Sequence, residues 1–127
     1  MLKKILISTG GSGGHVIPAI TIYNHLKNTH EALICTDIRG LAYLDKNYKP
    51  LVINTPKLNN YFLLPFSLLK ILLLTIKSFF LLKKNKISIL ISTGGYMSLP
   101  LCLAAKILGI NIFLIEPNMV LGRANKF

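Results

Sequence analysis

Acidic residues are scarce in this sequence: four Asp and Glu stand against fifteen Lys and Arg, which gives a formal net charge of +11. Such a surface favours a polyanionic partner, which could be nucleic acid, anionic lipid headgroups or a phosphorylated substrate. Arginine is also rare, since only Arg39 and Arg123 are present, and no basic stretch is interleaved with aromatic residues. We therefore expect no nucleic-acid partner, because nucleic-acid-binding surfaces gather such residues on one face.

Cysteine is limited to Cys35 and Cys102, which lie far apart in apolar contexts. This predicts two buried free thiols in a reducing cytoplasm rather than a disulfide. No cluster of Asp, Glu and His has the spacing of metal ligands, so we expect no protein-bound metal. The apolar run at the N-terminus is too short for a signal peptide, and no small-residue cleavage site follows it.

Hydrophobic residues, in contrast, make up 52% of the 127 residues, which fits one domain with a substantial core. Apolar runs predict strands at 4–8, 31–36, 50–55, 87–93 and 111–116, and helices are expected at 16–28, 39–46 and 98–109. Pro18 is expected in the first turn of helix 16–28, and we expect no internal repeat or linker. Strands that alternate with helices predict a Rossmann-like α/β domain, with a parallel sheet covered by helices on both faces.

Three loops follow strands of this predicted sheet, at 9–14, 93–97 and 116–125. The carboxyl ends of parallel strands share one edge, where α/β folds bind ligands, so we expect the loops to converge there. Two of the loops are rich in glycine: Gly10, Gly11, Gly13 and Gly14 in the first, Gly94 and Gly95 in the second. Glycines before a helix N-terminus let an anion such as a diphosphate approach the backbone closely.

The first glycine loop matches neither of two common phosphate-binding motifs in full. No Lys-Ser or Lys-Thr follows the glycines, so the loop is not a P-loop. Gly11 and Gly13, with Asp37 after the second strand, could begin a dinucleotide fingerprint, but Val16 stands where its third glycine should be. A dinucleotide-binding Rossmann domain therefore stays an alternative that Val16 argues against.

Three motifs of this sequence resemble the MurG family of glycosyltransferase family 28: GGSGGHVIPA at 10–19, STGGYMSLP at 92–100 and EPNMVLGRANK at 116–126. Its members transfer N-acetylglucosamine from UDP-N-acetylglucosamine to lipid I, which gives lipid II for peptidoglycan synthesis. They have the GT-B architecture, in which two Rossmann-like domains face a cleft. The resemblance implies that residues 1–127 are the N-terminal, acceptor-binding and membrane-associating domain, and that the C-terminal donor-binding domain is absent from this chain. We expect the 127 residues alone to be inactive, because the transition state needs groups from both sides of the cleft.

The resemblance also implies roles for individual residues. Contacts to the donor are implied for Ser12, Gly13, Gly14 and Asn118, and contacts to the acceptor or its diphosphate for Gly11, Gly94, Gly95, Tyr96, Ser98 and Asn125. His15 would be the general base of an inverting transfer, because an imidazole can take the proton of the attacking hydroxyl; a capping or hydrogen-bonding histidine is the alternative. Glu116 would be a second base, an orienting group or a residue that holds its loop.

Some neighbouring positions are less informative. Ile115 and Pro117 depart from the family's usual His and Gln, which bears on the local geometry of the third loop. His25 and His30, on and after the first predicted helix, are expected to be exposed to solvent.

A long apolar stretch runs from Tyr61 to Lys84, nearly the length that spans a bilayer. Lysines within it recur every seven residues, and each would cost roughly 2.5–3.5 kcal/mol at the centre of a span. We expect instead an interfacial helix that also covers the sheet; a buried core helix and a membrane span are the alternatives. The membrane-associating residues would be Phe66, Leu69, Lys70, Leu73, Lys77, Phe80 and Lys84.

The sequence thus predicts the N-terminal half of an inverting transferase that needs no cofactor and lies peripherally on the cytoplasmic face of the cell membrane. Its expected partners are UDP-N-acetylglucosamine, an undecaprenyl-diphosphate-linked acceptor lipid, an anionic membrane surface, and a C-terminal donor-binding domain or subunit. A non-catalytic, membrane-anchoring subunit of a split glycosyltransferase is the main alternative.

Overall fold

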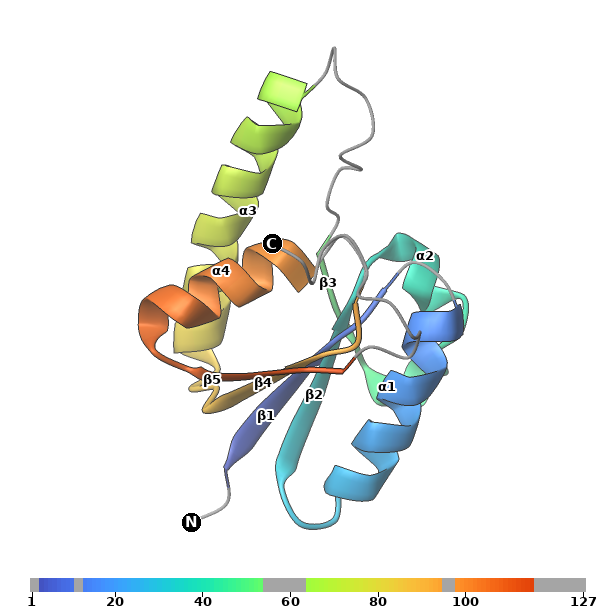
Figure 1. The fold of residues 1–127 in the computed structure, drawn as a ribbon. Coiled ribbons are helices and arrows are strands. Elements are labelled where there is room, and N and C mark those ends of the chain that lie inside the picture. Colours follow the sequence, from blue (N-terminus) through green and yellow to red (C-terminus); the bar gives the residue numbers. More distant parts are fainter. Residues whose placement is uncertain (1–2, 11–12, 54–63, 95–97, 116–127) are drawn as a thin grey trace.

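The computed structural model describes residues 3–10, 13–53, 64–94 and 98–115. They form a five-stranded parallel sheet in the order β3-β2-β1-β4-β5 (Figure 1). The strands are β1 (Lys4–Ser8), β2 (Glu31–Thr36), β3 (Leu51–Val52), β4 (Ile89–Ser92) and β5 (Asn111–Leu114). The helices are α1 (Gly13–Leu26), α2 (Ile38–Leu41), α3 (Leu64–Lys84) and α4 (Ser98–Leu108), with a short 3₁₀ helix at Lys46–Tyr48. The predicted Rossmann-like α/β fold is confirmed.

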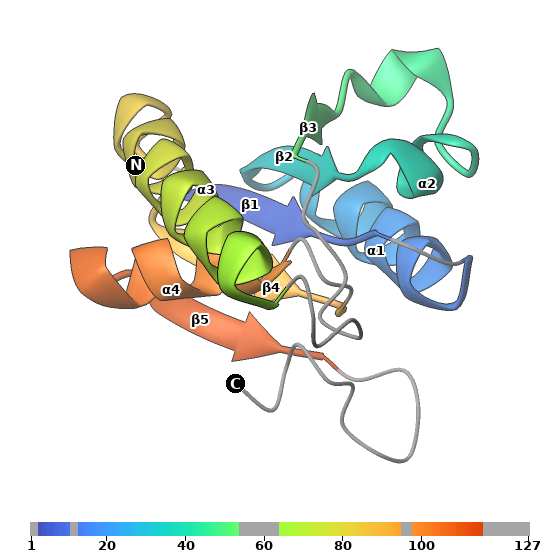
Figure 2. The same cartoon turned by 90° about the horizontal axis from the view of Figure 1, so that it is seen from above.

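Helices cover both faces of the sheet, with α1 and α2 on one side and α3 and α4 on the other (Figures 1 and 2). Successive strand residues point to opposite faces, so each strand contributes to two cores. Leu6 and Leu90 join the core under α3 and α4, which also includes Leu82 and Leu101. The residues on either side of Leu6 and Leu90 pack under α1; they are Ile5, Ile7, Ile89 and Ile91.

The first helix begins earlier than the sequence pattern predicts. It starts at Gly13 rather than at residue 16, so the glycines before His15 belong to its first turn and Pro18 lies further inside it. Glycine disfavours a helix interior, which made these positions look like loop. The cost is lower here because the first-turn N–H groups have no intrahelical partner in any case. The helix also ends sooner, at Leu26 rather than residue 28.

Other boundaries shift by smaller amounts. The helix predicted at 39–46 is two short pieces, because Asp37 caps α2 at its start and the 3₁₀ helix begins only at Lys46. The strand predicted at 87–93 narrows to Ile89–Ser92, while residues 54, 55 and 116 of two other predicted strands lie outside the described residues. Gly109 ends α4 as expected, with a φ of +74° that suits glycine.

The expectation of no internal repeat is wrong. The heptapeptide ILISTGG occurs twice, at 5–11 and at 89–95. The two copies are neighbours in the sheet, because β1 pairs with β4 in a register that sets Ile5 beside Ile89 and Ser8 beside Ser92. Identical residues of the two copies therefore lie side by side and face the same way.

Helix α3 has one side buried in the core and one side exposed at the surface. One side packs against α4 and buries Ile71, Ser78 and Leu82. The other side exposes large apolar residues, namely Leu68, Leu69, Leu72, Leu73, Ile76 and Phe80, together with Lys70, Lys77, Lys83 and Lys84. A wholly buried core helix is therefore excluded. Within the described ranges, no helix is both long enough and apolar enough to cross a membrane.

Both cysteines are free, as expected. Cys35 is fully buried in the core beneath α3 and α4, and burial raises the pKa of its thiol to about 12. Cys102 is only partly buried; burial raises the pKa of its thiol to about 11, against a smaller lowering by its hydrogen bond with Ser92. Both thiols are therefore protonated, and poor nucleophiles, near neutral pH.

The raised pKa of Cys35 predicts a loss of stability at alkaline pH. A thiol whose pKa is higher in the folded state stabilises that state below its ordinary value near 9, and this contribution falls as the pH rises toward 12. Between pH 8 and pH 10 the free energy of unfolding should fall by about 1 kcal/mol more in the native chain than in Cys35→Ala. Urea unfolding followed by circular dichroism measures this difference. The control is Val16→Ala, which truncates a buried residue that does not titrate, and its unfolding free energy should fall with pH as that of the native chain does. The same pH dependence in the native chain and in Cys35→Ala would contradict the prediction.

Candidate functional site

The candidate site lies where the strand order reverses. The chain passes from β1 through β2 to β3 on one side, then returns to β4 and β5 on the other side of β1. In open α/β sheets, ligands bind at the carboxyl ends of the strands at such a switch point. The first two predicted loops leave the sheet here, one after β1 and the other after β4. Ile115, which follows β5, donates its N–H to the Ser92 carbonyl at 2.8 Å and so brings the chain to the same edge.

His15 is held at this edge by the neighbouring strand. It lies in the first turn of α1, half-buried, with its Nδ1 2.9 Å from the carbonyl oxygen of Thr93. A carbonyl oxygen can only accept, so Nδ1 carries the hydrogen and donates it. In the neutral ring the lone pair is then on Nε2, for which no described residue is a hydrogen-bond partner. Of the two ring nitrogens, Nε2 is therefore the one that could accept a proton.

Gly94 forms the floor beneath the imidazole. Its φ of +109° is a conformation that L side chains rarely adopt. A Cβ at this position would also lie only 2.9 Å from Nδ1 of His15 and 3.0 Å from its Cε1. Both the backbone conformation and the close approach of the ring therefore require glycine here. This gives Gly94 a different reason for being glycine than the predicted contact with substrate, which stays a prediction.

Two buried threonines also join this site, and they were not among the predicted site residues. The Oγ1 of Thr93 lies 2.7 Å from the Oγ1 of Thr9 and 2.9 Å from the carbonyl oxygen of His15. Neither threonine is exposed to solvent. The repeated ILISTGG segment was the signal that could have identified them, because it sets Thr9 and Thr93 at equivalent places on paired strands.

The first turn of α1 presents its glycines differently. Gly14 is exposed, whereas Gly13 is covered by the ring of Tyr43, whose Cε1 would be 3.0 Å from a Cβ at position 13. The first-turn N–H groups, which have no intrahelical partner, and the helix dipole make this end of α1 favourable for an anion. The predicted contacts of Gly13 and Gly14 with the donor remain predictions.

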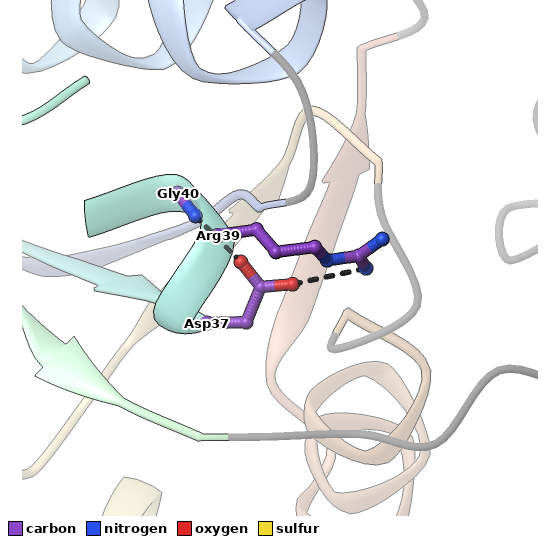
Figure 3. A network of polar contacts seen from close by, with 3 residues as sticks. All are labelled: Asp37, Arg39 and Gly40. Atoms are coloured by element: carbon purple, nitrogen blue, oxygen red, sulfur yellow. Dashed lines mark hydrogen bonds and ion pairs between the residues drawn. The ribbon is translucent and has the colours of Figure 1, made fainter. Parts of the chain in front are cut away.

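Asp37, the residue on which the dinucleotide alternative depends, is used within the protein. Its Oδ1 accepts the N–H of Gly40 at 2.8 Å, and its Oδ2 lies 3.2 Å from the Arg39 guanidinium (Figure 3). The carboxylate is 5% exposed. Both oxygens are engaged, so a cap for α2 explains Asp37 better than a ligand for a ribose hydroxyl does.

Several predicted residues cannot be placed. The following lie outside the described residues, and their roles stay predictions: Gly11, Ser12, Gly95, Tyr96, Glu116, Asn118 and Asn125. Ser98 is the first residue of α4, but its side chain is not described. His25 is exposed as expected, whereas His30 is half-buried beside the Thr29 hydroxyl, so that expectation was wrong. In the part of the chain that the structure describes, no three His, Cys, Asp or Glu side chains are grouped to hold a metal ion.

Gly94→Ala tests whether the His15 ring depends on the absence of a side chain at position 94, apart from the backbone strain that the substitution causes. Gly109→Ala is the matched control, because its φ is +74° and nothing lies within 4 Å of the added Cβ. A left-handed conformation costs an L residue about 1–2 kcal/mol, so both variants should lose that much unfolding free energy. Gly94→Ala should lose more unfolding free energy than Gly109→Ala does, because its added methyl group also displaces the His15 ring. The same displacement should change the ¹⁵N spectrum of that ring. Equal losses in the two variants, with an unchanged His15 spectrum, would show that the ring does not depend on Gly94.

The curated relatives of similar sequence share one enzyme name. The chain is 54% identical over its full length to the UDP-N-acetylglucosamine–N-acetylmuramyl-(pentapeptide) pyrophosphoryl-undecaprenol N-acetylglucosamine transferase of Pelagibacter ubique strain HTCC1062. It is 41% identical, over 97% of its length, to the enzyme of the same name in Wolbachia pipientis subsp. Culex pipiens. The chain spans 36% and 34% of these two relatives, about a third of their length.

Solved structures give the same result. MurG of Acinetobacter baumannii superimposes with a TM-score of 0.79 and 27% identity, over 98% of this chain and 38% of that one. A glycosyltransferase of Rickettsia africae superimposes with a TM-score of 0.66 at 20% identity, over 98% of this chain and 32% of that one, which shows the shared fold. The resemblance to the MurG family and the assignment to the N-terminal half of a GT-B architecture are thus confirmed. Residues 5–127 match the family model of the glycosyltransferase family 28 N-terminal domain, and the chain belongs to this family.

Proposed function

We propose that this chain is the acceptor-side domain of an inverting glycosyltransferase. Its donor is UDP-N-acetylglucosamine, and its acceptor is a muramyl-pentapeptide carried on undecaprenyl diphosphate, as the names of its relatives state for those enzymes. The observation that carries the proposal is the His15 ring at the switch point: its Nδ1 is held on the Thr93 carbonyl, and no described residue bonds to its Nε2. The MurG resemblance supports the same assignment through the motif that contains His15.

His15 acts in this proposal as the general base. Nε2 takes the proton of the acceptor hydroxyl while that oxygen attacks the anomeric carbon of N-acetylglucosamine. The bond from this carbon to the diphosphate breaks as the new one forms, and UDP leaves with the electron pair. A positioned base contributes typically 10²–10⁴-fold to such a step.

The first turn of α1 provides the electrostatic part of the site. Unpaired N–H groups at a helix N-terminus stabilise negative charge, and charge develops on the diphosphate as UDP leaves. Gly14 is exposed at this end of the helix and leaves the backbone accessible. The remaining donor contacts belong to a C-terminal domain or subunit across the cleft, so both halves are needed for turnover.

Helix α3 supplies the membrane-associating surface in this proposal. Leu69, Leu73 and Phe80 are more than half exposed, at 55%, 58% and 62%, which is unusual for such large apolar residues. Lys70, Lys77 and Lys84 recur every seven residues and form a line beside that apolar surface, between it and the side that packs on α4. An anionic lipid surface fits this combination, with acyl chains against the leucines and headgroups against the lysines. The acceptor is itself a lipid, so docking brings the site to its substrate.

Removal of the imidazole tests the base. In the complete two-domain transferase that carries this domain, His15→Gln should lower kcat by about 10²–10⁴-fold, because the glutamine amide cannot take the proton. UDP release with the lipid-linked acceptor measures the rate. His25→Gln, an exposed change near the other end of α1, is the control and should retain the native rate. A His15→Gln enzyme with native kcat would rule out the base role. If the native chain is active only when a separate donor-binding subunit is added, the split glycosyltransferase is favoured instead.

Charge removal from α3 tests the membrane surface. The variant Lys70→Gln with Lys77→Gln and Lys84→Gln should bind phosphatidylglycerol-containing vesicles about a hundredfold more weakly, since each surface lysine contributes about 1 kcal/mol. Co-sedimentation with vesicles measures the binding. The control changes three other exposed lysines, Lys3, Lys27 and Lys49, to Gln and so removes the same net charge elsewhere. Equal weakening in the two variants would show that net charge, rather than α3, determines binding.

A further inference from the structure

The threonines that follow β1 and β4 are among the buried polar residues of the described structure. Thr9 and Thr93 are both fully buried, and each is the fifth residue of its copy of the repeated segment ILISTGG. Burial of a hydroxyl is unfavourable unless it is hydrogen-bonded, and valine has nearly the same shape without that cost. The in-register pairing of the two segments places these hydroxyls within 2.7 Å of each other.

The directions of the two hydrogen bonds made by the Thr93 hydroxyl follow from which partner atoms can only accept. Thr93 has a single hydroxyl proton, and the His15 carbonyl oxygen 2.9 Å away can only accept it. Thr9 must then donate its own proton to Thr93 across the 2.7 Å contact. Thr93 therefore holds His15 at two points: its hydroxyl binds the His15 carbonyl, and its own carbonyl receives the His15 Nδ1–H.

We propose that Thr93 and Thr9 are positioning residues for His15. The hydroxyl pair ties the first turn of α1, a part of a helix that readily frays, to the end of β4. It thereby keeps the imidazole on the Thr93 carbonyl, in the tautomer with the hydrogen on Nδ1. This inference rests on the proposed base role of His15 and deepens it.

The arrangement also bears on the charged form of the ring. When Nε2 takes the acceptor proton, the ring becomes an imidazolium, and its Nδ1–H bond to the Thr93 carbonyl becomes charge-assisted and stronger. A ring that tilts away from Thr93 loses this stabilisation as well as its tautomer.

The test must separate positioning from folding. Thr93→Val alone would leave the Thr9 donor unpaired in the core, which is destabilising for its own reason. The double variant Thr9→Val with Thr93→Val removes both hydroxyls, and such a matched apolar pair is nearly neutral for stability. Thr36→Val is the control, because Thr36 is a buried threonine at the end of β2 whose hydroxyl has no partner in the described structure.

In the complete transferase, the double variant should unfold at the native urea midpoint but show a kcat about tenfold to a hundredfold lower, with little change in KM. The ¹⁵N spectrum of His15 in the free enzyme should change from one tautomer to a mixture of both. Thr9→Val with Thr93→Ser puts the position-93 hydroxyl back and should restore the rate and the spectrum. Thr36→Val should match the native enzyme in kcat, KM and His15 spectrum.

A double variant that is stably folded, with native kcat and an unchanged His15 spectrum, would overturn the proposal and leave the threonine pair a structural contact only. The spectrum is independent of catalysis. If His15→Gln keeps its activity, the base role fails, and a mixed tautomer in the double variant would still support positioning by the threonines.

Discussion

The in-register pairing of β1 with β4 is the constraint on which the rest of this structure depends. It joins two strands that are remote in sequence, and it is the point at which the order of the sheet reverses. His15 follows one of these strands and Thr93 the other, yet Nδ1 and the carbonyl oxygen are 2.9 Å apart across a separation of 78 residues. A slip of one residue would turn every side chain of a strand to the opposite face and would separate the threonines as well.

The same pairing organises the two sides of the sheet for different tasks. Toward α1, the isoleucines of both strands form the small core that supports the helix carrying His15. Toward α3 and α4, Leu6 and Leu90 anchor the larger core on which α3 rests. With α3 held on that face, its far side remains free to carry apolar residues and lysines outward. The candidate site and the proposed membrane surface thus share one scaffold.

Several features of the chain could be predicted from local patterns. Apolar strands alternating with helices determine an α/β fold, because such strands must be covered on both faces. Glycines after strands predicted that two loops meet at one edge of the sheet, and the pairing of β1 with β4 places them there; the role of His15 stays a prediction from its motif. The ends of the helices were less predictable. Gly13 and Gly14 resemble a loop in composition, but they belong to the first turn of α1, which tolerates glycine. Asp37 resembled a ribose ligand, but its burial and its contacts with Gly40 and Arg39 are those of a helix cap.

The sequence by itself determined the composition of the core, the class of fold, the family and the presence of a histidine beside a glycine-rich turn. These properties depend on residue type and short-range spacing, which are written directly in the chain. Only the tertiary structure decided which nitrogen of His15 is bound to the Thr93 carbonyl, why Gly94 must lack a side chain, and that Thr9 and Thr93 meet. Those properties depend on distances of a few tenths of an ångström between segments far apart in sequence, and the strand register that sets these distances is a property of the folded sheet.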